Sequence, residues 1–333
     1  SWRYVERPFR RRGQQGLSRA RLGVAIGGAA ALLLSASVAI RTSEGAPERL
    51  PLQALRYLSA KADHLDEVGD CSGADLSQTS LPCSLGEEGK PVRVLLWGDS
   101  HARVLGGAVD RLADAVDFGG IGLVEGGCPP LVGVDRSDEP GVCLDFGERV
   151  IEYVNENDID VVVLHARWPM YVEGRRYGFE DGTVPLNGKD GAALVHDKLG
   201  QLIEYLEVRD IDVVLIGSVP EAGFNVPDTL ALATLLDRRQ KTFSLDRQAV
   251  DARQRRTSIM LRDLAGRYRV PLIDPIAALC DFESCYLEKD GLSLYADEDH
   301  LSREGVALLE PLLAPLRLEL EKAAWRGGLE GRK

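Results

Sequence analysis

Short apolar runs alternate with amphipathic helical patterns along most of the chain from Val92 onward. The apolar runs are "VRVLLWG", "DVVVLHA", "DVVLIGSVP" and "VPLIDP", and stretches with helical spacing of apolar residues separate them. Strands that are apolar almost throughout, each separated by a helix, are typical of a parallel sheet covered on both faces. We therefore predict a three-layer α/β/α domain over residues 91–320, followed by a C-terminal tail over residues 321–333.

One segment near the N-terminus, "LGVAIGGAAALLLSASVAI" from Leu22 to Ile40, is uncharged over 19 residues. At about 1.5 Å per residue, a helix of this length nearly matches a bilayer core of about 30 Å. We predict one transmembrane helix over residues 22–41, in contact with the lipid bilayer through Leu22–Ile40. A cleaved signal peptide and a buried core helix are alternative interpretations of the same pattern.

The charges around this segment predict its orientation. Residues 1–21 carry seven arginines and one glutamate, whereas acidic, proline-containing sequence follows the segment. The positive-inside rule then places residues 1–21 in the cytoplasm. We expect residues 42–90 to form an extracytoplasmic linker and loop, and the α/β domain to lie on the outer side of the membrane.

The overall charge argues against one class of partner. The formal net charge is −12 although the N-terminal segment is strongly basic, so the rest of the chain is acidic. Binding to nucleic acid needs clustered Lys and Arg that neutralise phosphates. We therefore predict no nucleic-acid partner.

The cysteines agree with export. There are six, and they fall along the chain as three neighbouring pairs, which are Cys71 and Cys83, Cys128 and Cys143, and Cys280 and Cys285. An even number of cysteines in an exported protein favours disulfides, and sequential pairing is one of 15 possible connectivities. A zinc site is the alternative, but no pair has zinc-knuckle spacing and only five histidines are present. We predict three local disulfides and no metal site.

A candidate nucleophile lies where the first apolar run ends. In "LLWGDSHARV", Ser100 follows a strand and begins a helical pattern, so unpaired helix N–H groups and a positive dipole lie next to it. Asp99 or Ser100 could equally be the N-cap of that helix. A serine nucleophile needs a base and an orienting acid, and "DEDH" supplies both as Asp297 and His300. An acidic solvated turn before a helix capped by Ser302, or a calcium loop, are the alternatives for "DEDH".

These motifs resemble a known family. "GDSH" near the start of an α/β domain, with Asp297 and His300 as D-x-x-H at its end, resembles the SGNH (GDSL-type) hydrolases, which have a flavodoxin-like parallel sheet. "PCSLG", "GGCPPL", "VVVLHARWPMY" and "LYADEDHLS" are similar to the SGNH domain joined to bacterial type-3 acyltransferases, over about residues 71 to 315. "SWRYVERPFRRR" is similar to the end of the membrane acyltransferase domain, so we expect Ser1 to be a fragment boundary with that domain upstream.

The resemblance implies roles for individual residues. Ser100 would attack the acyl carbon, His300 would accept its proton, and Asp297 would orient the imidazole. The backbone N–H of Ser100 and that of Gly126 or Gly127 would donate hydrogen bonds to the oxyanion.

One departure from the family pattern is the absence of the usual oxyanion Asn, because the matching strand end reads "HARWP". Arg167 is a candidate oxyanion donor at that place, and Trp168 is a candidate for stacking on a sugar ring. Both are therefore predicted substrate-binding residues, with a structural role at the strand end as the alternative.

The resemblance also implies an activity. We expect a serine-dependent O-acyltransferase, with acetyl as the transferred group, that modifies a hydroxyl of a cell-envelope glycan. The chain itself is expected to bind no cofactor, because the upstream membrane domain would consume acetyl-CoA. A carbohydrate esterase and a non-catalytic glycan-binding domain are the two alternatives.

Overall fold

The computed structural model describes residues 19–43, 47–66, 83–87, 89–136, 140–173, 191–236 and 243–330. The chain divides into two compact units, Ser1–Pro51 and Leu52–Lys333. In the first unit, α2 (Arg19–Thr42) is followed by the short 3-10 helix η2 (Pro47–Arg49). By length and composition, Gly23–Thr42 of α2 is long and apolar enough to cross a membrane. The helix therefore has nearly the bounds predicted for the transmembrane segment.

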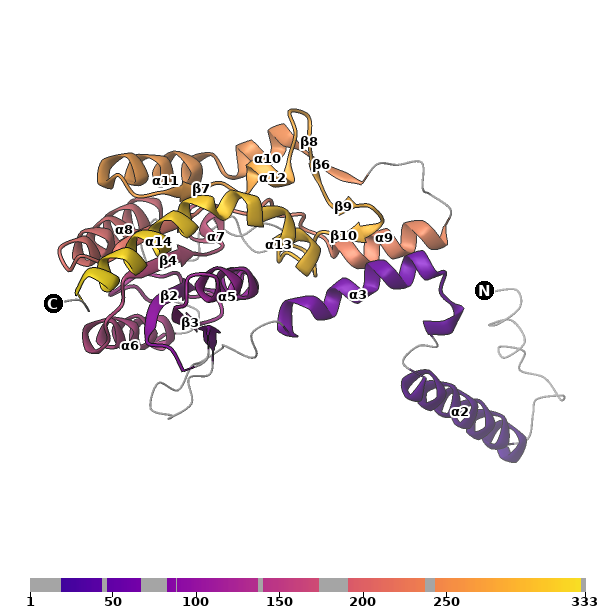
Figure 1. Cartoon of the computed structure of the whole chain (residues 1–333). Helices are drawn as coiled ribbons and strands as arrows, with labels where there is room; N and C mark the ends of the chain where they lie inside the picture. The colour runs from indigo at the N-terminus through magenta and orange to yellow at the C-terminus, as the bar shows by residue number, and fades with distance from the viewer. Residues whose placement is uncertain are drawn as a thin grey trace. The chain divides into compact units, whose positions relative to one another are not determined.

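The second unit is built on a six-stranded sheet (Figure 1). In spatial order the strands are β1 (Ser84–Gly86), β3 (Gly119–Val124), β2 (Val92–Gly98), β4 (Val161–His165), β5 (Asp212–Ile216) and β7 (Leu272–Ile273). Strands β3, β2, β4, β5 and β7 are parallel, as predicted, and β1 adds an antiparallel edge. The carboxyl ends of β2, β4 and β5 therefore meet at one edge of the sheet.

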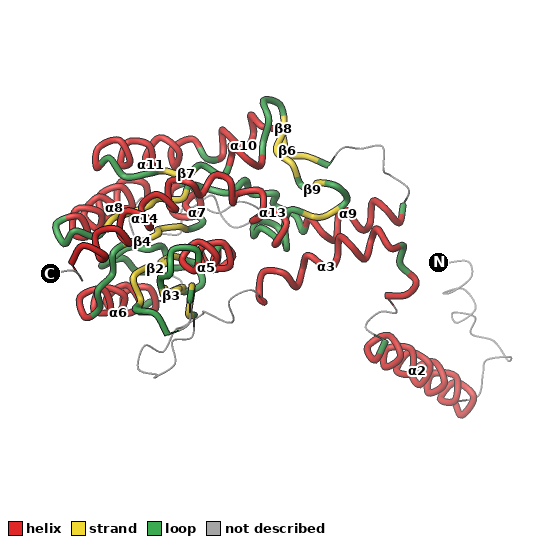
Figure 2. The backbone as a smooth tube through the Cα atoms, in the orientation of Figure 1, coloured by secondary structure: helices red, strands yellow, loops and turns green. Residues whose placement is uncertain are grey.

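Helices cover both faces of the sheet (Figures 1 and 2). Leu95 and Trp97 belong to a core cluster with three helices, α6 (Val142–Glu156), α8 (Gly191–Glu207) and α11 (Arg255–Tyr268). Because side chains alternate along a strand, Val94 and Leu96 point to the other face, where α5 (Gly106–Asp114) and α14 (Ala314–Glu330) contact the strands. This arrangement confirms the predicted three-layer fold.

Three helical segments of the second unit are interrupted. The first is divided at Leu105 into α4 (Ser100–Val104) and α5, and the second at Gln254 into α10 (Arg247–Arg253) and α11. The last consists of α13 (Arg303–Leu309), the 3-10 helix η3 (Glu310–Leu313) and α14. Proline lacks an N–H and is tolerated in a first helical turn, which is where Pro311 stands in η3.

The fold extends beyond the limits predicted for the sheet domain, residues 91–320, at both ends. Helix α14 continues to Glu330, and Leu320 and Ala323 are buried, so the predicted tail at 321–333 begins as part of the fold. At the other end, the predicted linker over residues 42–90 supplies β1, whose Leu85 is buried. Apolar burial explains both differences, since these segments cover sheet and helix surface that would otherwise meet water.

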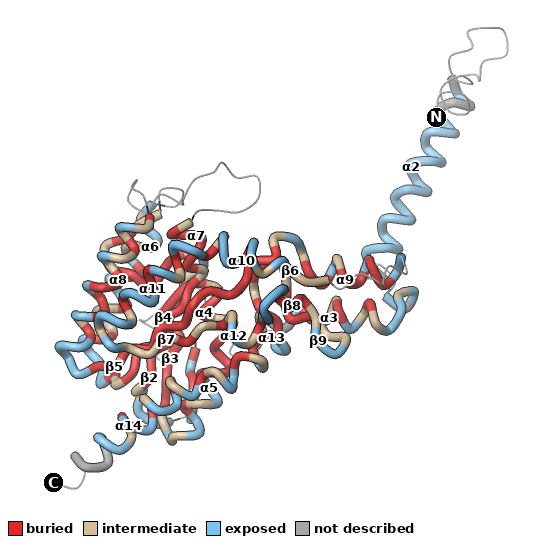
Figure 3. Tube along the Cα trace, turned by 90° about the horizontal axis from the view of Figure 1, so that it is seen from above, coloured by how far each residue is buried: buried red, intermediate tan, exposed pale blue. Residues whose placement is uncertain are grey.

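The same linker region also supplies a helix. Ala54, Tyr57 and Ala60 of α3 (Leu52–Asp66) are buried, and α3 lies beside α9 (Val226–Leu235) (Figure 3). Tyr57 donates a hydrogen bond to Oε2 of Glu288, 3.0 Å away. Small elements complete the unit, namely α7 (Trp168–Val172), α12 (Ile276–Leu279), β6 (Ser244–Asp246), β8 (Ser284–Tyr286), β9 (Glu288–Lys289) and β10 (Leu292–Ser293).

Two of the three predicted disulfides are present in the described residues. Cys128 is bonded to Cys143 and Cys280 to Cys285. The first bridge fixes the loop after β3 to the start of α6. Cys71, of the third predicted pair, lies outside the described residues.

Candidate active site

Ser100 lies at the turn from β2 into α4. A Cβ atom at Gly98 would lie 1.8 Å from the carbonyl oxygen of His165, so only glycine lets β2 end this close to β4. Asp99 is the N-cap of α4, because its carboxylate accepts a hydrogen bond from the N–H of His101 at 2.9 Å. Of the two candidate caps, it is therefore Asp99 that caps the helix, and the Ser100 hydroxyl is left for another contact.

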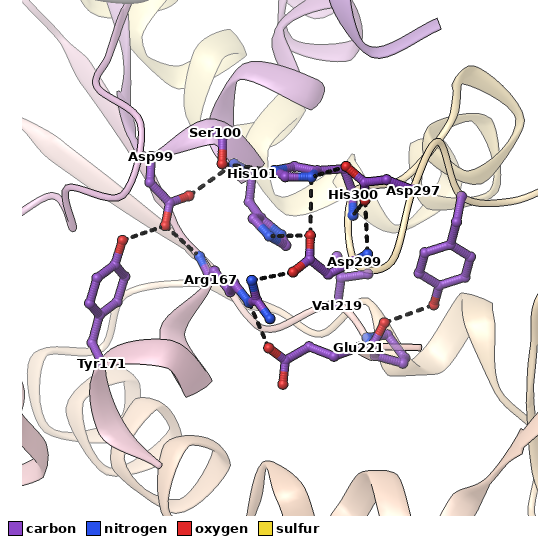
Figure 4. A network of polar contacts seen from close by, with 12 residues as sticks. Asp99, Ser100, His101, Arg167, Tyr171, Val219, Glu221, Asp297, Asp299 and His300 are labelled. Carbon is purple, nitrogen blue, oxygen red and sulfur yellow. Dashed lines mark hydrogen bonds and ion pairs between the residues drawn. The ribbon is translucent and has the colours of Figure 1, made fainter. Parts of the chain in front are cut away.

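That contact is with His300, 200 residues along the chain (Figure 4). Nε2 of His300 lies 2.7 Å from Oγ of Ser100, and Nδ1 lies 2.7 Å from Oδ2 of Asp297. The other oxygen of Asp297 accepts the backbone N–H groups of Asp299 and His300, at 2.9 and 2.8 Å. The "DEDH" loop thus folds back on itself, and it brings together the acid, the imidazole and the serine that the sequence singled out.

The charges of this pair stabilise each other. Burial alone would raise the pKa of Asp297, but the hydrogen bond and the positive charge of His300 outweigh it and hold that pKa well below its usual range. Burial likewise would lower the pKa of His300, yet hydrogen bonds to Asp297 and Asp299 and their negative charges raise it well above that of an ordinary histidine. The loop is therefore built to stabilise a protonated imidazole.

A second carboxylate reaches the same imidazole. Oδ1 of Asp299 lies 3.0 Å from Nδ1 of His300, and its Oδ2 forms an ion pair with Nη1 of Arg167. Arg167 also donates from Nε to Oε1 of Glu221 at 2.6 Å, and Arg253 donates to Oε2 at 2.5 Å. A network of buried ion pairs therefore extends inward from the imidazole (Figure 4).

Asp99 connects the ends of two strands. Besides capping α4, its carboxylate accepts the backbone N–H of Arg167 at 2.9 Å and the hydroxyl of Tyr171 at 2.8 Å. Burial raises its pKa, although these hydrogen bonds oppose the shift. Asp99 therefore fixes the turn from β2 into α4 through backbone hydrogen bonds.

Two other histidines lie next to the site. His101 is buried with its ring centroid 4.5 Å from that of His300, and burial together with the charge of His300 lowers its pKa well below the usual value. His165 is also buried, which lowers its pKa to about 4, and its Nδ1 lies 3.2 Å from the carbonyl of Ile216. Both rings are therefore neutral near neutral pH.

A metal ion is an alternative occupant of this place. His101, Asp299 and His300 bring potential ligand atoms within 4.8 Å of one another. The ion pair of Asp299 with Arg167 and the hydrogen bonds of His300 with Ser100 and Asp297 already engage two of these three residues. We therefore assign the three residues to the polar network rather than to a metal.

Comparison with known proteins identifies the fold. Residues 70–315 match the family described as SGNH domain (fused to AT3 domains). The chain belongs to this SGNH family. Among solved structures, it is similar to the periplasmic domain of the lipopolysaccharide acetyltransferase of Salmonella ser. Paratyphi A, with 18% identity, a TM-score of 0.51, and coverage of 68% of this chain and 84% of that one.

Other solved structures are less similar. A GDSL-like lipase from Bacteroides thetaiotaomicron has 16% identity and a TM-score of 0.40, covering 69% of this chain and 88% of that one. An acetyl xylan esterase has 17% identity and a TM-score of 0.39, covering 67% of this chain and 98% of that one. A search of curated proteins found no match. The family supports acyl transfer or hydrolysis of the SGNH type as the chemistry of this domain.

The predicted sugar-stacking role of Trp168 is wrong. Its side chain is 0% exposed, and its indole N–H donates to the carbonyl of Ile216 at 2.9 Å. Its neighbours in the core cluster include Leu199 of α8 and Leu264 of α11. Trp168 is thus a core residue of the SGNH domain that satisfies its one polar atom inside the protein.

Replacement of Trp168 by alanine is expected to lower the free energy of unfolding by about 3–5 kcal/mol, the usual effect of removing a large buried aromatic side chain. Urea denaturation followed by circular dichroism measures the change. Trp325→Ala is the matched control, because Trp325 is 68% exposed on α14 and its loss is expected to change stability by less than about 0.5 kcal/mol. Unchanged stability of the Trp168 variant together with weakened glycan binding would contradict this assignment.

Two predicted oxyanion residues lie beside the serine turn. Gly126 and Gly127 follow β3, whose last residue Val124 pairs with Gly98 of β2, so they begin at the carboxyl edge that holds Ser100. Gly127 has a φ of +72°, and a Cβ atom there would collide with the guanidinium of Arg136. Their role as hydrogen-bond donors stays a prediction.

Arg167 has a different setting from the one expected. Its Nε and Nη1 atoms bind Glu221 and Asp299, and its side chain is 24% exposed. It therefore belongs to the ion-pair network, and a contact with substrate stays a prediction.

Sequence reasoning missed the acids of this network. Asp299 stands inside the "DEDH" motif itself, where alternate acids could have signalled two carboxylates near one histidine. Glu221 follows the apolar run "DVVLIGSVP", at the carboxyl edge where α/β folds place their sites. Arg253 gave no such signal, because nothing in its helical pattern distinguishes a buried arginine from a solvated one.

Proposed function

We propose that this SGNH domain is a serine-dependent O-acyltransferase that transfers an acetyl group to a hydroxyl of a cell-envelope glycan. The observation that carries the proposal is the position of His300, with Nε2 2.7 Å from Oγ of Ser100 and Nδ1 2.7 Å from Asp297. Both distances lie within hydrogen-bond reach, as proton transfer requires. This geometry favours an enzyme over a glycan-binding domain that only kept the fold.

The proposed reaction has two halves. Oγ of Ser100 attacks the carbonyl carbon of the acyl donor while its proton moves to Nε2 of His300, and that proton then leaves with the departing group. Next, the acceptor hydroxyl attacks the acyl-serine, gives its proton to Nε2, and Ser100 regains a proton from the imidazole. Asp297 holds the imidazole and stabilises its positive charge during both halves.

The tetrahedral intermediates carry a negative oxygen. The N–H of Ser100 and that of Gly126 or Gly127 are the proposed donors to it, since both segments begin at the same edge of the sheet. In this proposal the chain binds no cofactor, and acetyl-CoA is consumed by a membrane acyltransferase domain upstream.

Transfer to an envelope glycan is favoured over hydrolysis by three observations. The family consists of SGNH domains fused to AT3 domains. The similar Salmonella structure is the periplasmic domain of a lipopolysaccharide acetyltransferase. Helix α2 is long and apolar enough to cross a bilayer, so we propose an anchored domain on the periplasmic side of the inner membrane.

A direct test uses the full chain in detergent with an aryl acetate as donor and an O-antigen polysaccharide as acceptor. Mass spectrometry of the polysaccharide is expected to show added acetyl groups. These groups are expected to be absent when the enzyme is inactive. Release of acetate without acetylated glycan, even at saturating acceptor, would show that the domain is an esterase. Absence of both products would contradict an acyl-serine mechanism.

The pH dependence of the first half-reaction follows from the raised pKa of His300. Only the neutral imidazole can accept the proton of Ser100, so kcat/KM is expected to fall as the pH drops below the pKa of His300. Because that pKa is raised, the acid limb is expected above about 6.5, the usual histidine value. Rates of aryl acetate hydrolysis from about pH 5 to about pH 10 locate this limb. A plateau already reached at pH 6 would contradict the expectation.

A further inference from the structure

Asp299 contacts both the imidazole of His300 and the guanidinium of Arg167. One oxygen of this buried carboxylate lies 3.0 Å from Nδ1 of His300, and the other pairs with the guanidinium of Arg167. Nδ1 of His300 already has Asp297 as its 2.7 Å partner. The imidazole therefore faces two carboxylates, of which one is tied to a cation.

The other polar groups around the imidazole come from several elements. They are Ser100, His101 and the N-cap Asp99 at α4, Arg167 after β4, Glu221 after β5, and Arg253 at the end of α10. His101 is neutral near neutral pH, and Asp99 is hydrogen-bonded to the chain and to Tyr171. Glu221 shares its charge between two arginines. Among the residues that the structure describes, Arg167 is thus the cation in contact with Asp299.

Two carboxylates on one imidazole create a problem for a general base. Each negative charge stabilises the protonated ring, and in a buried site such effects are strong. A second uncompensated carboxylate would therefore raise the proton affinity of His300, and the imidazole would release its proton to the leaving group less readily. A guanidinium on the far oxygen of that carboxylate offsets its charge and leaves its orienting contact in place.

We propose that the ion pair between Arg167 and Asp299 sets the proton affinity of His300, with both residues acting as positioning residues. Asp299 is a second acceptor beside Nδ1 of His300, and Arg167 limits how strongly the charge of Asp299 favours the protonated imidazole. The link of this ion pair to catalysis rests on the proposed function of Ser100 and His300. The effect of the ion pair on the proton affinity of the imidazole does not depend on that function.

Histidine NMR on the full chain in detergent tests this directly. The chain has five histidines, so a ¹⁵N-histidine spectrum is simple, and His300→Gln assigns the signal of His300. Arg167→Met is expected to raise the pKa of His300 by about one unit, because Asp299 loses its cation. Asp299→Asn is expected to lower it by about one unit or more, because one carboxylate is gone and Arg167 remains.

The double variant Arg167→Met/Asp299→Asn completes the cycle. Its pKa is expected between those of the two single variants, because the charges are removed together. Arg167→Lys keeps the positive charge and is expected to stay near the unchanged protein. If Arg167→Met fails to fold, Asp299→Asn and Arg167→Lys still test the proposal, since one removes a charge and the other preserves it.

Opposite shifts in the two single variants support the proposal, because a purely structural role would not give them. Shifts of the same sign, or no shift, would overturn it, as would a rise in KM for the Arg167 variant with an unchanged pKa. The NMR readout needs no turnover. An inactive enzyme with opposite pKa shifts would therefore count against the proposed function alone, and an active one without them against this inference alone.

Discussion

The variant Ser100→Ala is expected to lose acyl turnover by a factor of about 10⁵ or more, because no acyl-enzyme can form without Oγ. The fold is expected to survive, since Asp99 and not Ser100 caps α4. Steady-state kcat/KM with an aryl acetate measures the loss of activity. Circular dichroism and thermal unfolding of the same preparation show whether the protein remains folded.

Ser59→Ala is a suitable control for this experiment. Ser59 is exposed on α3, and its hydroxyl donates only to the carbonyl of Arg56 in the same helix among its described contacts. This control is expected to keep full activity and stability. Turnover that persists in Ser100→Ala would contradict the acyl-serine mechanism, and a loss of activity accompanied by unfolding would mean that the serine serves the structure.

The three residues of the serine site were predictable because each stands in a local pattern with a physical meaning. Ser100 follows an apolar strand at a strand-to-helix turn, and Asp297 and His300 lie in one short polar loop before a helix. The D-x-x-H spacing by itself lets the carboxylate turn back to the imidazole. Their meeting with Ser100 required only that both loops lie at the carboxyl edge of the same parallel sheet.

No local pattern indicated which charges of the ion-pair network would pair with one another. Arg167, Glu221 and Arg253 come from three different elements, and their contacts join residues 32 to 54 positions apart. The burial of Trp168 was likewise not predictable from its local sequence. Whether a tryptophan at a strand end is exposed or buried depends on the helices that pack over that end.

The missed strand β3 has a compositional explanation. Its sequence "GGIGLV" contains three glycines, which have low strand propensity and no side chains to give a pattern. The structure needs those small residues, since a Cβ atom at Gly119 would lie 2.6 Å from the carbonyl oxygen of Lys90 and one at Gly120 3.1 Å from Cβ of Leu85. Close approach of β1 and of the segment before β2 thus selects glycines that hide the strand from sequence analysis.

The variant Glu221→Gln is expected to show the largest loss of stability among single charge changes in the site, about 3 kcal/mol. Glu221 is 1% exposed and binds both Arg167 and Arg253, so a neutral side chain leaves two guanidinium groups without their shared counter-charge. Removing one partner of a buried ion pair costs more than the pair contributes, because the remaining charges stay poorly solvated. Chemical denaturation measures the change, and Glu148→Gln, on an exposed position of α6, is the matched control.

The pH dependence of this loss has a defined sign. Burial alone would raise the pKa of Glu221, but the hydrogen bonds and charges of the two arginines outweigh it and lower the pKa below 4.5. A group whose pKa is lower in the folded state stabilises the fold at pH values above its unfolded pKa, and this contribution is lost as the pH falls through the folded pKa. The stability difference between Glu221→Gln and the unchanged protein is therefore expected to be full at neutral pH and to shrink in strong acid. A difference that grows with acidity would mean that Glu221 is protonated in the folded protein, and the ion-pair account of this network would fail.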